Sequence, residues 1–356
     1  EPDLTGWLDL VALGTVCDVV PLTGINRALV SQGLKVMGQR RNTGLKALAD
    51  VAGLKEAPET YHAGFQLGPR INAGGRIGSP DLGSRLLGTD DADEAMEIAH
   101  RLDELNLERR GIEAAVQEAA VEEAEKVGDD LGPLVVCAGE GWHPGVIGIV
   151  AGRLKDRFNR PACVIAFDGD TGTGSGRSIT GVDLGAAVIA ACQAGILIKG
   201  GGHKMAAGFT VEKAKLEELK AFLSDRVATD IKEGDIRPTL YLDGAMKPKA
   251  ADMNLLEILA QVGPFGAGNP EPRFVIPAAQ LSYAAVVGER HVRGFVTGEG
   301  GGRLAAISFN CVDSPLGQAL LNSDGAPLHL AGRLKVNTWQ GRSSAQLHID
   351  DAAPAW

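Results

Sequence analysis

The chain has 356 residues, of which 44% are hydrophobic and 22% charged, and its formal net charge is −10. That length allows two or three domains, each with its own core, and the composition is typical of a globular protein. The absence of any apolar run of about 18 residues argues against a membrane span. Five scattered cysteines without zinc-type spacing predict buried free thiols and a cytoplasmic protein.

The acidic charge is concentrated in one segment. Residues 90–125 contain 13 acidic and 3 basic residues, so the rest of the chain is neutral overall and is compatible with a local basic groove for nucleic acid. The first residues, EPDLTGWLDL, contain neither an initiator Met nor a signal pattern. We therefore expect the chain to be a piece of a longer protein.

The N-terminal part begins with a continuous apolar run, LDLVALGTVCDVVPL, at residues 8–22. This run predicts a buried strand and then a turn that carries Asp18, while residues 26–53 have helical spacing with a break expected at Gly44. A carboxylate after a buried strand lies where open α/β sheets bind ligands, although such residues equally often cap a helix. As a metal ligand, Asp18 needs partners that nothing nearby in the sequence supplies.

Residues 65–80, FQLGPRINAGGRIGSP, predict a glycine-rich loop that holds two arginines. Guanidinium groups bind phosphate oxygens in pairs, so Arg70 and Arg76, with Asn72 between them, are candidates for phosphate contact. The alternative is that the arginines pair with acidic residues of the helix that follows. That helix is predicted over residues 90–127, as a long acidic connector with a narrow apolar stripe. Gly111 within it has low helix propensity and weakens the prediction of one unbroken helix.

The segment from 129 to 230 predicts a small α/β domain. Its elements are expected as strands at 133–138 and 161–167, a helix between them starting near Pro144, an extended glycine-rich segment at 171–179, a helix from Asp183 and a closing helix at 211–228.

Three glycine-rich stretches of this domain each carry one polar or basic side chain: GEGWHPGVIG has His143, GTGSGRS has Arg177, and GGGHKMAAG has His203. Backbone N–H groups and helix N-termini at such places can hold anionic oxygens. One histidine of this kind more often has a structural role, but three such stretches in one domain favour a phosphate-binding surface. None has the P-loop spacing.

From residue 231 onward, short alternating runs separated by turns predict a small β-barrel or sandwich. Bases of a single strand can stack on aromatic side chains of such a domain. The candidates, which could equally be barrel core, are Phe265, Tyr283, Phe295 and Trp339.

Five of these stretches resemble, in the same order, the RecJ-type single-strand-specific exonucleases of the DHH phosphoesterase superfamily. They are LDLVALGTVCDVVPL, GPRINAGGRIG, GWHPGVIGIVAGRL, SGRSI and GGGHKMAAGF. The later PFGAGNPEPRF and the β-rich tail resemble the OB-type nucleic-acid-binding domain of that family. The resemblance covers essentially the whole chain.

The resemblance implies an α/β architecture of four parts. These are the C-terminal part of a DHH lobe at 1–89, a connecting helix at 90–128, a substrate-binding DHH-associated (DHHA1) lobe at 129–230 and an OB-like barrel at 231–356.

The implied activity is 5′→3′ hydrolysis of single-stranded DNA by metal-activated water, with Mn²⁺ or Mg²⁺, in DNA repair and recombination. Asp18 matches a metal ligand of the family. The implied catalytic residues are His203, Arg70 and Arg76. The implied substrate-binding residues are Asn72, His143, Ser175, Arg177, Ser178, Gly201 and Gly202.

One departure from the family pattern is that no Asp-His-His signature occurs in this sequence. A two-metal site needs several ligands to hold its ions about 3.5–4 Å apart, so we expect this chain alone to be inactive. Two alternatives stay open: a phosphodiesterase for oligoribonucleotides or cyclic dinucleotides, and a non-catalytic nucleic-acid-binding scaffold. The expected partner is single-stranded DNA, bound by a monomer without a membrane, with a single-strand-binding protein or helicase as a further partner.

Overall fold

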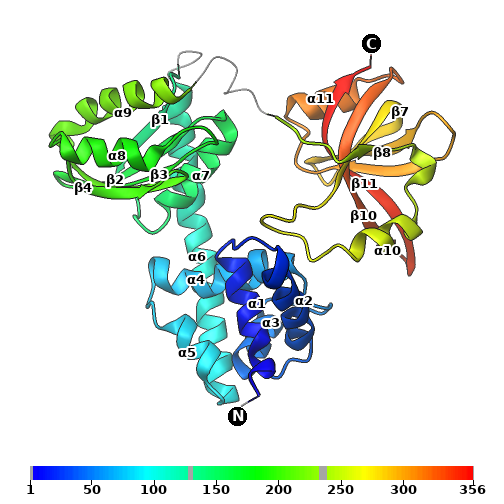
Figure 1. Ribbon diagram of the computed structural model, residues 1–356, viewed down its shortest axis with the longest axis horizontal. Coiled ribbons are helices and arrows are strands. Elements are labelled where there is room, and N and C mark those ends of the chain that lie inside the picture. Colours follow the sequence, from blue (N-terminus) through cyan, green and yellow to red (C-terminus); the bar gives the residue numbers. More distant parts are fainter. Residues whose placement is uncertain (1–2, 127–130, 232–238, 356) are drawn as a thin grey trace. The chain divides into compact units, whose positions relative to one another are not determined.

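The computed structural model describes residues 3–126, 131–231 and 239–355 (Figure 1). The chain forms two compact units. One contains Arg40–Glu56 and Phe65–Thr239, and the other contains the residues up to Gln39, Ala57–Gly64 and the residues from Leu240 onward. The predicted boundary at 128/129 lies outside the described residues, and the division into four domains stays a prediction.

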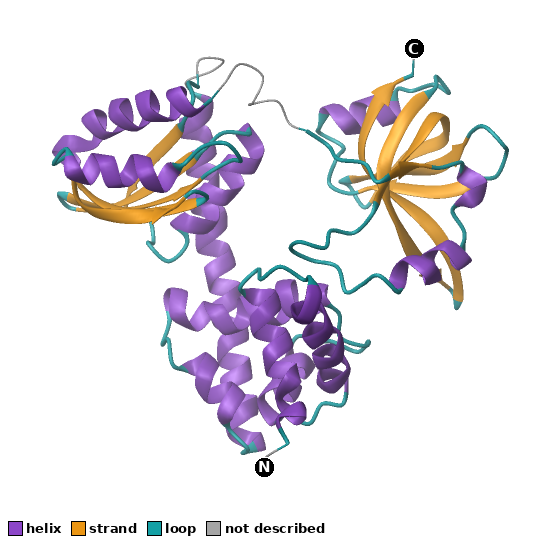
Figure 2. Ribbon diagram, in the orientation of Figure 1, coloured by secondary structure: helices purple, strands orange, loops and turns teal. Residues whose placement is uncertain are grey.

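The predicted strand at residues 8–22 is wrong, because this segment is helical (Figure 2). A short 3₁₀ turn, η1 (Leu4–Trp7), leads into α1 (Leu8–Cys17), and α2 (Gly24–Gly38) follows. A short run of Leu, Val and Ala has no periodicity that separates a buried strand from a buried helix. The backbone N–H of Asp18 donates to the carbonyl of Gly14 at 2.9 Å, so Asp18 ends a helix.

The predicted break at Gly44 is also wrong. The chain turns between Gln39 and Asn42, and α3 (Thr43–Val51) begins after Asn42, whose side chain accepts the N–H of Leu45 at 2.8 Å. Gly44 lies in the first turn of α3, where an added Cβ would come within 1.7 Å of the Leu86 carbonyl oxygen. This glycine therefore permits close approach to α5 (Leu82–Gly88).

The predicted glycine-rich loop at 65–80 is mostly helix. A π-helical turn, η2 (His62–Leu67), continues into α4 (Gly68–Ile77), which has a proline in its first turn. At Gly74 a Cβ would lie 2.8 Å from the Ser79 carbonyl oxygen. The backbone thus comes close to its neighbours there, and packing overrides the low helix propensity of glycine.

The long acidic helix is confirmed as α6 (Ala92–Glu125), which continues through Gly111. Asp91 caps it by accepting the N–H groups of Asp93 and Glu94. The first half of α6 packs against α3, α4 and α5, and its second half packs against α7 (Ile147–Phe158) and β1 (Val135–Glu140) of the following sheet. α6 therefore connects two cores within one unit.

The predicted small α/β domain is present as a five-stranded sheet of order β1-β2-β3-β5-β4 (Figure 1). β1 and β2 are parallel and the other neighbours are antiparallel. The strands are β1 (Val135–Glu140), β2 (Ala162–Asp168), β3 (Thr171–Arg177), β4 (Leu197–His203) and β5 (Ala206–Glu212). The helices are α7 (Ile147–Phe158), α8 (Leu184–Gln193) and α9 (Leu216–Asp230), with a 3₁₀ turn, η4 (Lys213–Lys215), before α9.

One prediction in this domain fails. The closing helix, expected from residue 211, begins at Leu216, because residues 206–212 form β5 and pair with both β3 and β4. The stretch GGGHKMAAG is thus a β-hairpin that turns at Lys204 and Met205.

The predicted β-barrel is confirmed in the other unit. Its strands follow the order β10-β11-β9-β8-β7-β6, and β10 also pairs with β7, which closes the barrel. The strands are β6 (Gly244–Ala245), β7 (Arg273–Val287), β8 (His291–Thr297), β9 (Leu304–Ser308), β10 (Leu328–Trp339) and β11 (Arg342–Pro354). Its helical segments are η5 (Pro248–Ala250), α10 (Met253–Ala260) and α11 (Pro315–Leu321).

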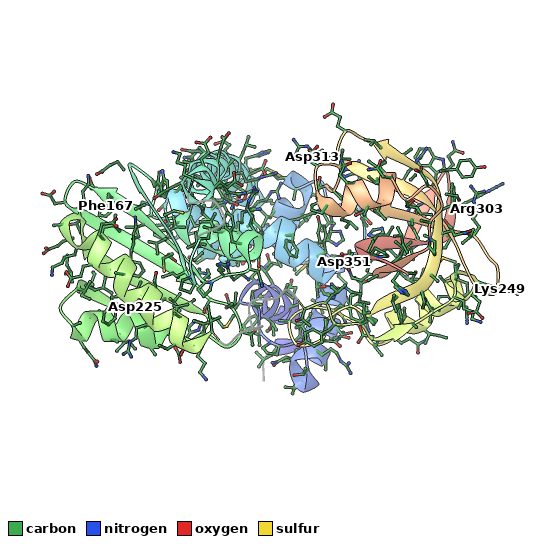
Figure 3. The ribbon with its side chains drawn as sticks, turned by 90° about the horizontal axis from the view of Figure 1, so that it is seen from above. Phe167, Asp225, Lys249, Arg303, Asp313 and Asp351 are labelled. Carbon is green, nitrogen blue, oxygen red and sulfur yellow. The ribbon has the colours of Figure 1, made fainter. Side chains whose placement is uncertain are left out.

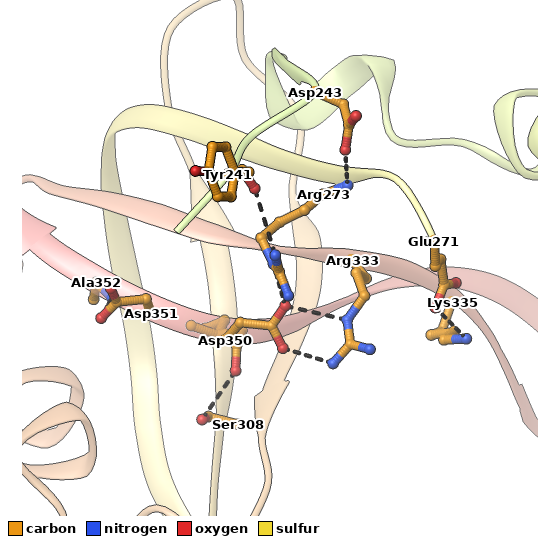
Figure 4. Close-up of polar contacts among 11 residues, drawn as sticks. Tyr241, Asp243, Glu271, Arg273, Ser308, Arg333, Lys335, Asp350, Asp351 and Ala352 are labelled. Carbon is orange, nitrogen blue, oxygen red and sulfur yellow. Dashed lines mark hydrogen bonds and ion pairs between the residues drawn. The ribbon is translucent and has the colours of Figure 1, made fainter. Parts of the chain in front are cut away.

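An ion-pair network joins three barrel strands on the outer wall (Figure 4). The Asp350 carboxylate accepts from Arg273 Nε at 2.8 Å and from Arg333 Nη2 at 2.7 Å. Burial raises the pKa of Asp350, but the hydrogen bonds from Arg333 and Arg273 outweigh it, so the pKa is lowered. The network therefore holds β7, β10 and β11 together around an ionised carboxylate.

Candidate substrate-binding site

The N-terminus of α7 presents unpaired backbone donors. After His143, Pro144 and Gly145, the helix begins at Ile147, and the Val146 N–H donates to the His143 carbonyl at 3.1 Å. In the described ranges, the N–H groups of Ile147 and Gly148 have no acceptor. The first N–H groups of a helix carry partial positive charge, so this end favours an anion.

Arg177 and Ser175 of β3 lie directly over this helix end. A Cβ added at Gly148 would come within 3.0 Å of Arg177 Nη2 and 3.0 Å of Ser175 Oγ. Arg177 Nη1 donates to Ser175 Oγ at 3.2 Å and to the Gly176 carbonyl at 2.8 Å, which fixes the guanidinium in place. Donors from a helix end, a hydroxyl and a guanidinium therefore converge on one point.

Arg76 brings a second guanidinium from the last turn of α4. Its Nη1 donates to the Gly145 carbonyl at 3.0 Å, and a Cβ at Gly145 would lie 2.2 Å from the Arg76 carbonyl oxygen. Burial lowers the pKa of Arg177, and the like charge of Arg76 lowers it further. Neither arginine has a carboxylate partner in the part of the chain that the structure describes. An anion here would relieve this repulsion.

In two histidines, the ring accepts a hydrogen bond from the backbone N–H two residues later in the chain. His143 Nδ1 accepts the N–H of Gly145 at 3.0 Å, and His203 Nδ1 accepts the N–H of Met205 at 3.4 Å. These hydrogen bonds assign the proton of each neutral ring to Nε2. Each Nε2–H is therefore a donor that points away from its own turn.

Strand register places His203 in line with Arg177. His203 pairs with Ala206, and Ala206 pairs with Arg177, so the three residues form one row across β4, β5 and β3. Residues directly opposite in antiparallel strands share a face, and strands are about 4.8 Å apart. His203 and Arg177 thus face the same side of the sheet, roughly 10 Å apart. Gly201 and Ser175 belong to the next row.

The predicted residues Arg76, His143, Ser175 and Arg177 lie together, and Gly201 and His203 lie on the same sheet face. Arg70 is instead paired with Asp103 of α6 at 2.8 Å, as the alternative reading of that segment expected. Asn72 is exposed on α4, and the buried Ser178 hydroxyl donates to the Val182 carbonyl at 3.0 Å. Gly202 faces the opposite side, where a Cβ would meet Ala207. The roles of all these residues stay predictions.

The donor set does not by itself fit a two-metal centre. Asp18 belongs to the other unit, where its exposed carboxylate follows the last turn of α1. Among the residues that the structure describes, no group of three His, Cys, Asp or Glu side chains is placed to hold a metal ion. A single carboxylate is a suitable ligand for a hard divalent cation, but it is only one of the six or more that such ions take.

The barrel carries a second candidate surface, made of aromatic rings. The Arg303 guanidinium lies 3.6 Å from the centre of the Phe295 ring and 5.5 Å from that of Tyr283, and Figure 3 shows Arg303 at the outer edge of the barrel. Tyr283 is 79% exposed, and its edge-on contact with Phe295 spans 6.5 Å between ring centres. A β-bulge directs Tyr283 outward, since the register of β7 and β8 shifts between Ser282 and Ala285.

The other aromatic candidates differ in exposure. Trp339 is 72% exposed at the β10–β11 turn. Phe265 is half-buried in a loop, and its backbone carbonyl accepts a hydrogen bond from the Thr60 hydroxyl at 2.8 Å. Sequence reasoning missed Arg303, whereas it did propose the helix N-terminus near His143 as a place that can hold anionic oxygens. A proline three residues before the helix was the available signal for α7, but it marks the helix start without showing what faces it.

Comparisons with known proteins match the two domains in which these surfaces lie. Residues 131–229 match the model of the DHHA1 domain, and residues 242–351 match that of the RecJ OB domain. The single-stranded-DNA-specific exonuclease RecJ of Dickeya dadantii is 38% identical over 364 residues, 99% of this chain and 62% of the relative. The Escherichia coli RecJ is 38% identical over 365 residues, with the same coverage. The chain is thus homologous to RecJ over nearly its whole length, and it contains a DHHA1 domain and a RecJ OB domain.

A solved structure supports the same assignment. The crystal structure of RecJ from Thermus thermophilus with Mg²⁺ matches with a TM-score of 0.84 and 30% identity, over 99% of this chain and 52% of that chain. The predicted DHHA1 lobe and OB-type barrel are thereby confirmed. The chain spans 62% of the length of the first two relatives. No helix of the described residues is long and apolar enough to cross a membrane.

Proposed function

We propose that this chain forms the substrate-binding part of a 5′→3′ exonuclease for single-stranded DNA, in which the phosphate at the strand end binds between Arg76, Arg177 and the N-terminus of α7. The observation that carries the proposal is a pair of arginines beside two backbone N–H groups, none of which has a carboxylate or other acceptor of negative charge among the residues that the structure describes. A phosphate accepts from all of these donors at once. The RecJ relatives, which are named as exonucleases specific for single-stranded DNA, support the choice of substrate.

The roles of the chain's own residues follow from this arrangement. Arg76, Arg177 and Ser175 bind and orient the phosphate, and His203 donates a hydrogen bond from Nε2 to the substrate in the same row of the sheet. A bound divalent metal would activate water and polarise the phosphodiester, and Asp18 is this chain's proposed ligand for it. Because one carboxylate cannot hold two ions, the chain alone should turn over little DNA.

Binding and turnover test the proposal separately. With a chelator present, we expect the chain to bind a 5′-phosphorylated oligothymidylate more tightly than the 5′-hydroxyl form. Equal binding of both forms would contradict the phosphate site. With Mn²⁺ and 5′-labelled strands we expect little product, and robust metal-dependent turnover would contradict the single-ligand reading of Asp18.

His203 is tested in the nuclease-active form of the protein. His203→Ala should lower turnover sharply without changing thermal stability, because the residue is exposed and its ring accepts a hydrogen bond from its own hairpin. Unchanged turnover would reduce the GGGH stretch to a packing role. The proposal also includes action in DNA repair and recombination, a monomeric state, a cytoplasmic location and a single-strand-binding protein or helicase partner, which sedimentation and pull-down experiments can check.

The barrel bears on the choice between substrates. Tyr283, Phe295 and Arg303 offer stacking surfaces that a dinucleotide bound at α7 would not need. This favours a polynucleotide over the cyclic-dinucleotide alternative. A non-catalytic scaffold predicts equal binding but no turnover in any form of the protein, which the same assays distinguish.

A further inference from the structure

One half of the α/β sheet is covered on only one face. α8 contacts β4 and β5 from one side, while α7 contacts β2 and β3 from the other. On the α7 side, no described helix of this unit covers β4 and β5, and a Cβ at Gly201 would meet nothing within 4 Å. At Gly208 the nearest atom to such a Cβ is 3.9 Å away. Gly201 and Gly208 therefore form an open stretch of glycine backbone beside the Arg177 site, which we call the glycine floor.

The floor ends in a third row of polar side chains. Lys199 of β4 pairs with Thr210 of β5, and Thr210 pairs with Thr173 of β3. Lys199 belongs to the open face, because a Cβ at the next residue, Gly200, would instead meet Val188 of α8 at 2.8 Å. Alternate residues along a strand are about 7 Å apart, so the Lys199 row lies roughly 14 Å from the Arg177 row.

Lys199 is exposed, and no carboxylate pairs with it among the described residues. Other lysines of the same unit do have such partners: Lys213 pairs with Glu140, and Lys215 with Glu218 at 2.7 Å. In a protein of net charge −10, a cation left unpaired at the end of an open floor is available to an external anion.

We propose that Lys199 binds a second phosphate of the same DNA strand, so that the strand end lies across the glycine floor from Arg177 to Lys199. This inference rests on the proposed function, because Arg177 must hold the terminal phosphate. Arg177 and Lys199 are about 14 Å apart along the strands and roughly 10 Å apart across them, or roughly 17 Å in all. This distance exceeds the 3.4 Å rise per nucleotide of a stacked strand, so the two phosphates are not adjacent ones of a stacked strand. Bare backbone between them lets the flat bases approach closely.

Salt-dependent binding tests the proposal. With a chelator present, the affinity of the whole chain is measured for thymidine 5′-monophosphate and for a 5′-phosphorylated pentathymidylate over a range of salt concentrations. For Lys199→Ala we expect pentathymidylate affinity to fall about three- to tenfold at low salt. The slope of log K against log salt should shrink by about 0.7, the value for one phosphate contact of a single strand. Monophosphate affinity should not change.

The controls separate the possible failures. Lys46→Ala removes another exposed lysine, on α3, without a carboxylate partner among the described residues, and it should change neither affinity nor slope. Lys199→Arg should retain the wild-type slope. An unchanged pentathymidylate slope in Lys199→Ala, or equal weakening of both ligands, would overturn the second phosphate contact. If the wild-type chain itself gains no affinity from a 5′-phosphate, the proposed function fails first.

Discussion

The arginines beside the open face of the α/β sheet and those on the outer wall of the barrel differ in their interaction partners. Beside the sheet, Arg76 of α4 and Arg177 of β3 donate to carbonyls and a hydroxyl, and neither has a carboxylate partner among the described residues. On the barrel, Arg273 and Arg333 are paired with Asp350, and the Arg303 guanidinium lies over the Phe295 ring. The cations of the sheet are thus free to meet an anion, whereas those of the barrel already have partners.

This difference predicts two kinds of contact with one strand. Unpaired cations beside backbone donors are suited to phosphate oxygens, and their contribution falls steeply with salt. Exposed aromatic rings with a stacked guanidinium are suited to the faces of bases, because every base has a π-face whatever its identity. Substitutions on the sheet should therefore weaken the binding that depends on the 5′-phosphate, and substitutions on the barrel should weaken the binding that depends on the bases.

The largest expected effect is on the sheet, from Arg177→Ala. Hydrogen bonds to charged groups contribute about 1.5–3 kcal/mol, so affinity for a 5′-phosphorylated strand should fall about 10- to 150-fold. Fluorescence anisotropy with phosphorylated and hydroxyl-ended strands measures this. The loss should be confined to the phosphorylated strand, and an equal loss for both strands would place Arg177 outside the terminal phosphate site. Arg101→Ala, at an exposed arginine of α6 paired with Glu104, is the control.

Filling the glycine floor is expected to have the next largest effect. Gly201→Val adds a side chain where the fold has open space, so the free energy of unfolding should stay equal or rise by about 0.5–1 kcal/mol, since valine favours strands. Strand affinity should still fall about tenfold, a loss of about 1.4 kcal/mol, because the side chain occupies the ligand's place. Gly152→Ala, at another open glycine on α7, should leave affinity unchanged. A stable Gly201→Val protein with full affinity would show that no ligand crosses the floor.

The sequence predicts the elements best where pattern and length agree. The acidic helix α6 with its apolar stripe, the buried strands β1 and β2 and the alternating strands of the barrel were all predicted, because each has an unambiguous period or length. The prediction from the sequence fails at α1 and α4. In α1 a short apolar run has no distinguishing period, and in α4 the glycines that suggest a loop are there to let helices approach.

The candidate site was predictable only in part. Glycine-rich stretches identified His143, Arg177 and His203, but the hairpin that puts His203 in register with Arg177 depends on tertiary pairing of β5. The ion pair of Arg70 with Asp103 distinguishes it from Arg76, and nothing in the spacing of the two arginines reveals this. Contacts between residues far apart in the chain therefore decide which of the similar side chains is free.

A smaller effect is expected on the barrel, from Tyr283→Gly. Stacking on an aromatic ring contributes about 1–3 kcal/mol per base, and Phe295 remains, so affinity for oligothymidylate should fall only about five- to tenfold. An abasic strand should bind both proteins equally. Tyr283 has φ of 54°, a left-handed conformation that costs roughly 1 kcal/mol outside glycine, so Tyr283→Gly should not lower thermal stability. Loss of abasic-strand binding would contradict base stacking.

The smallest effect concerns the paired arginines of the barrel and is on stability. The Asp350 pKa is below its usual value, so its pairing stabilises the fold fully above the ordinary aspartate pKa of about 4 and is lost as pH falls through the lower folded value. Asp350→Asn should lower the free energy of unfolding by about 1 kcal/mol at pH 7, since the pair is partly screened by solvent. Urea unfolding from pH 7 to pH 3 should show the two proteins converging below about pH 4. A difference that does not shrink at all between pH 4 and pH 3 would mean that shape rather than charge makes Asp350 stabilising, and the barrel's arginines would then be no better neutralised than those of the sheet.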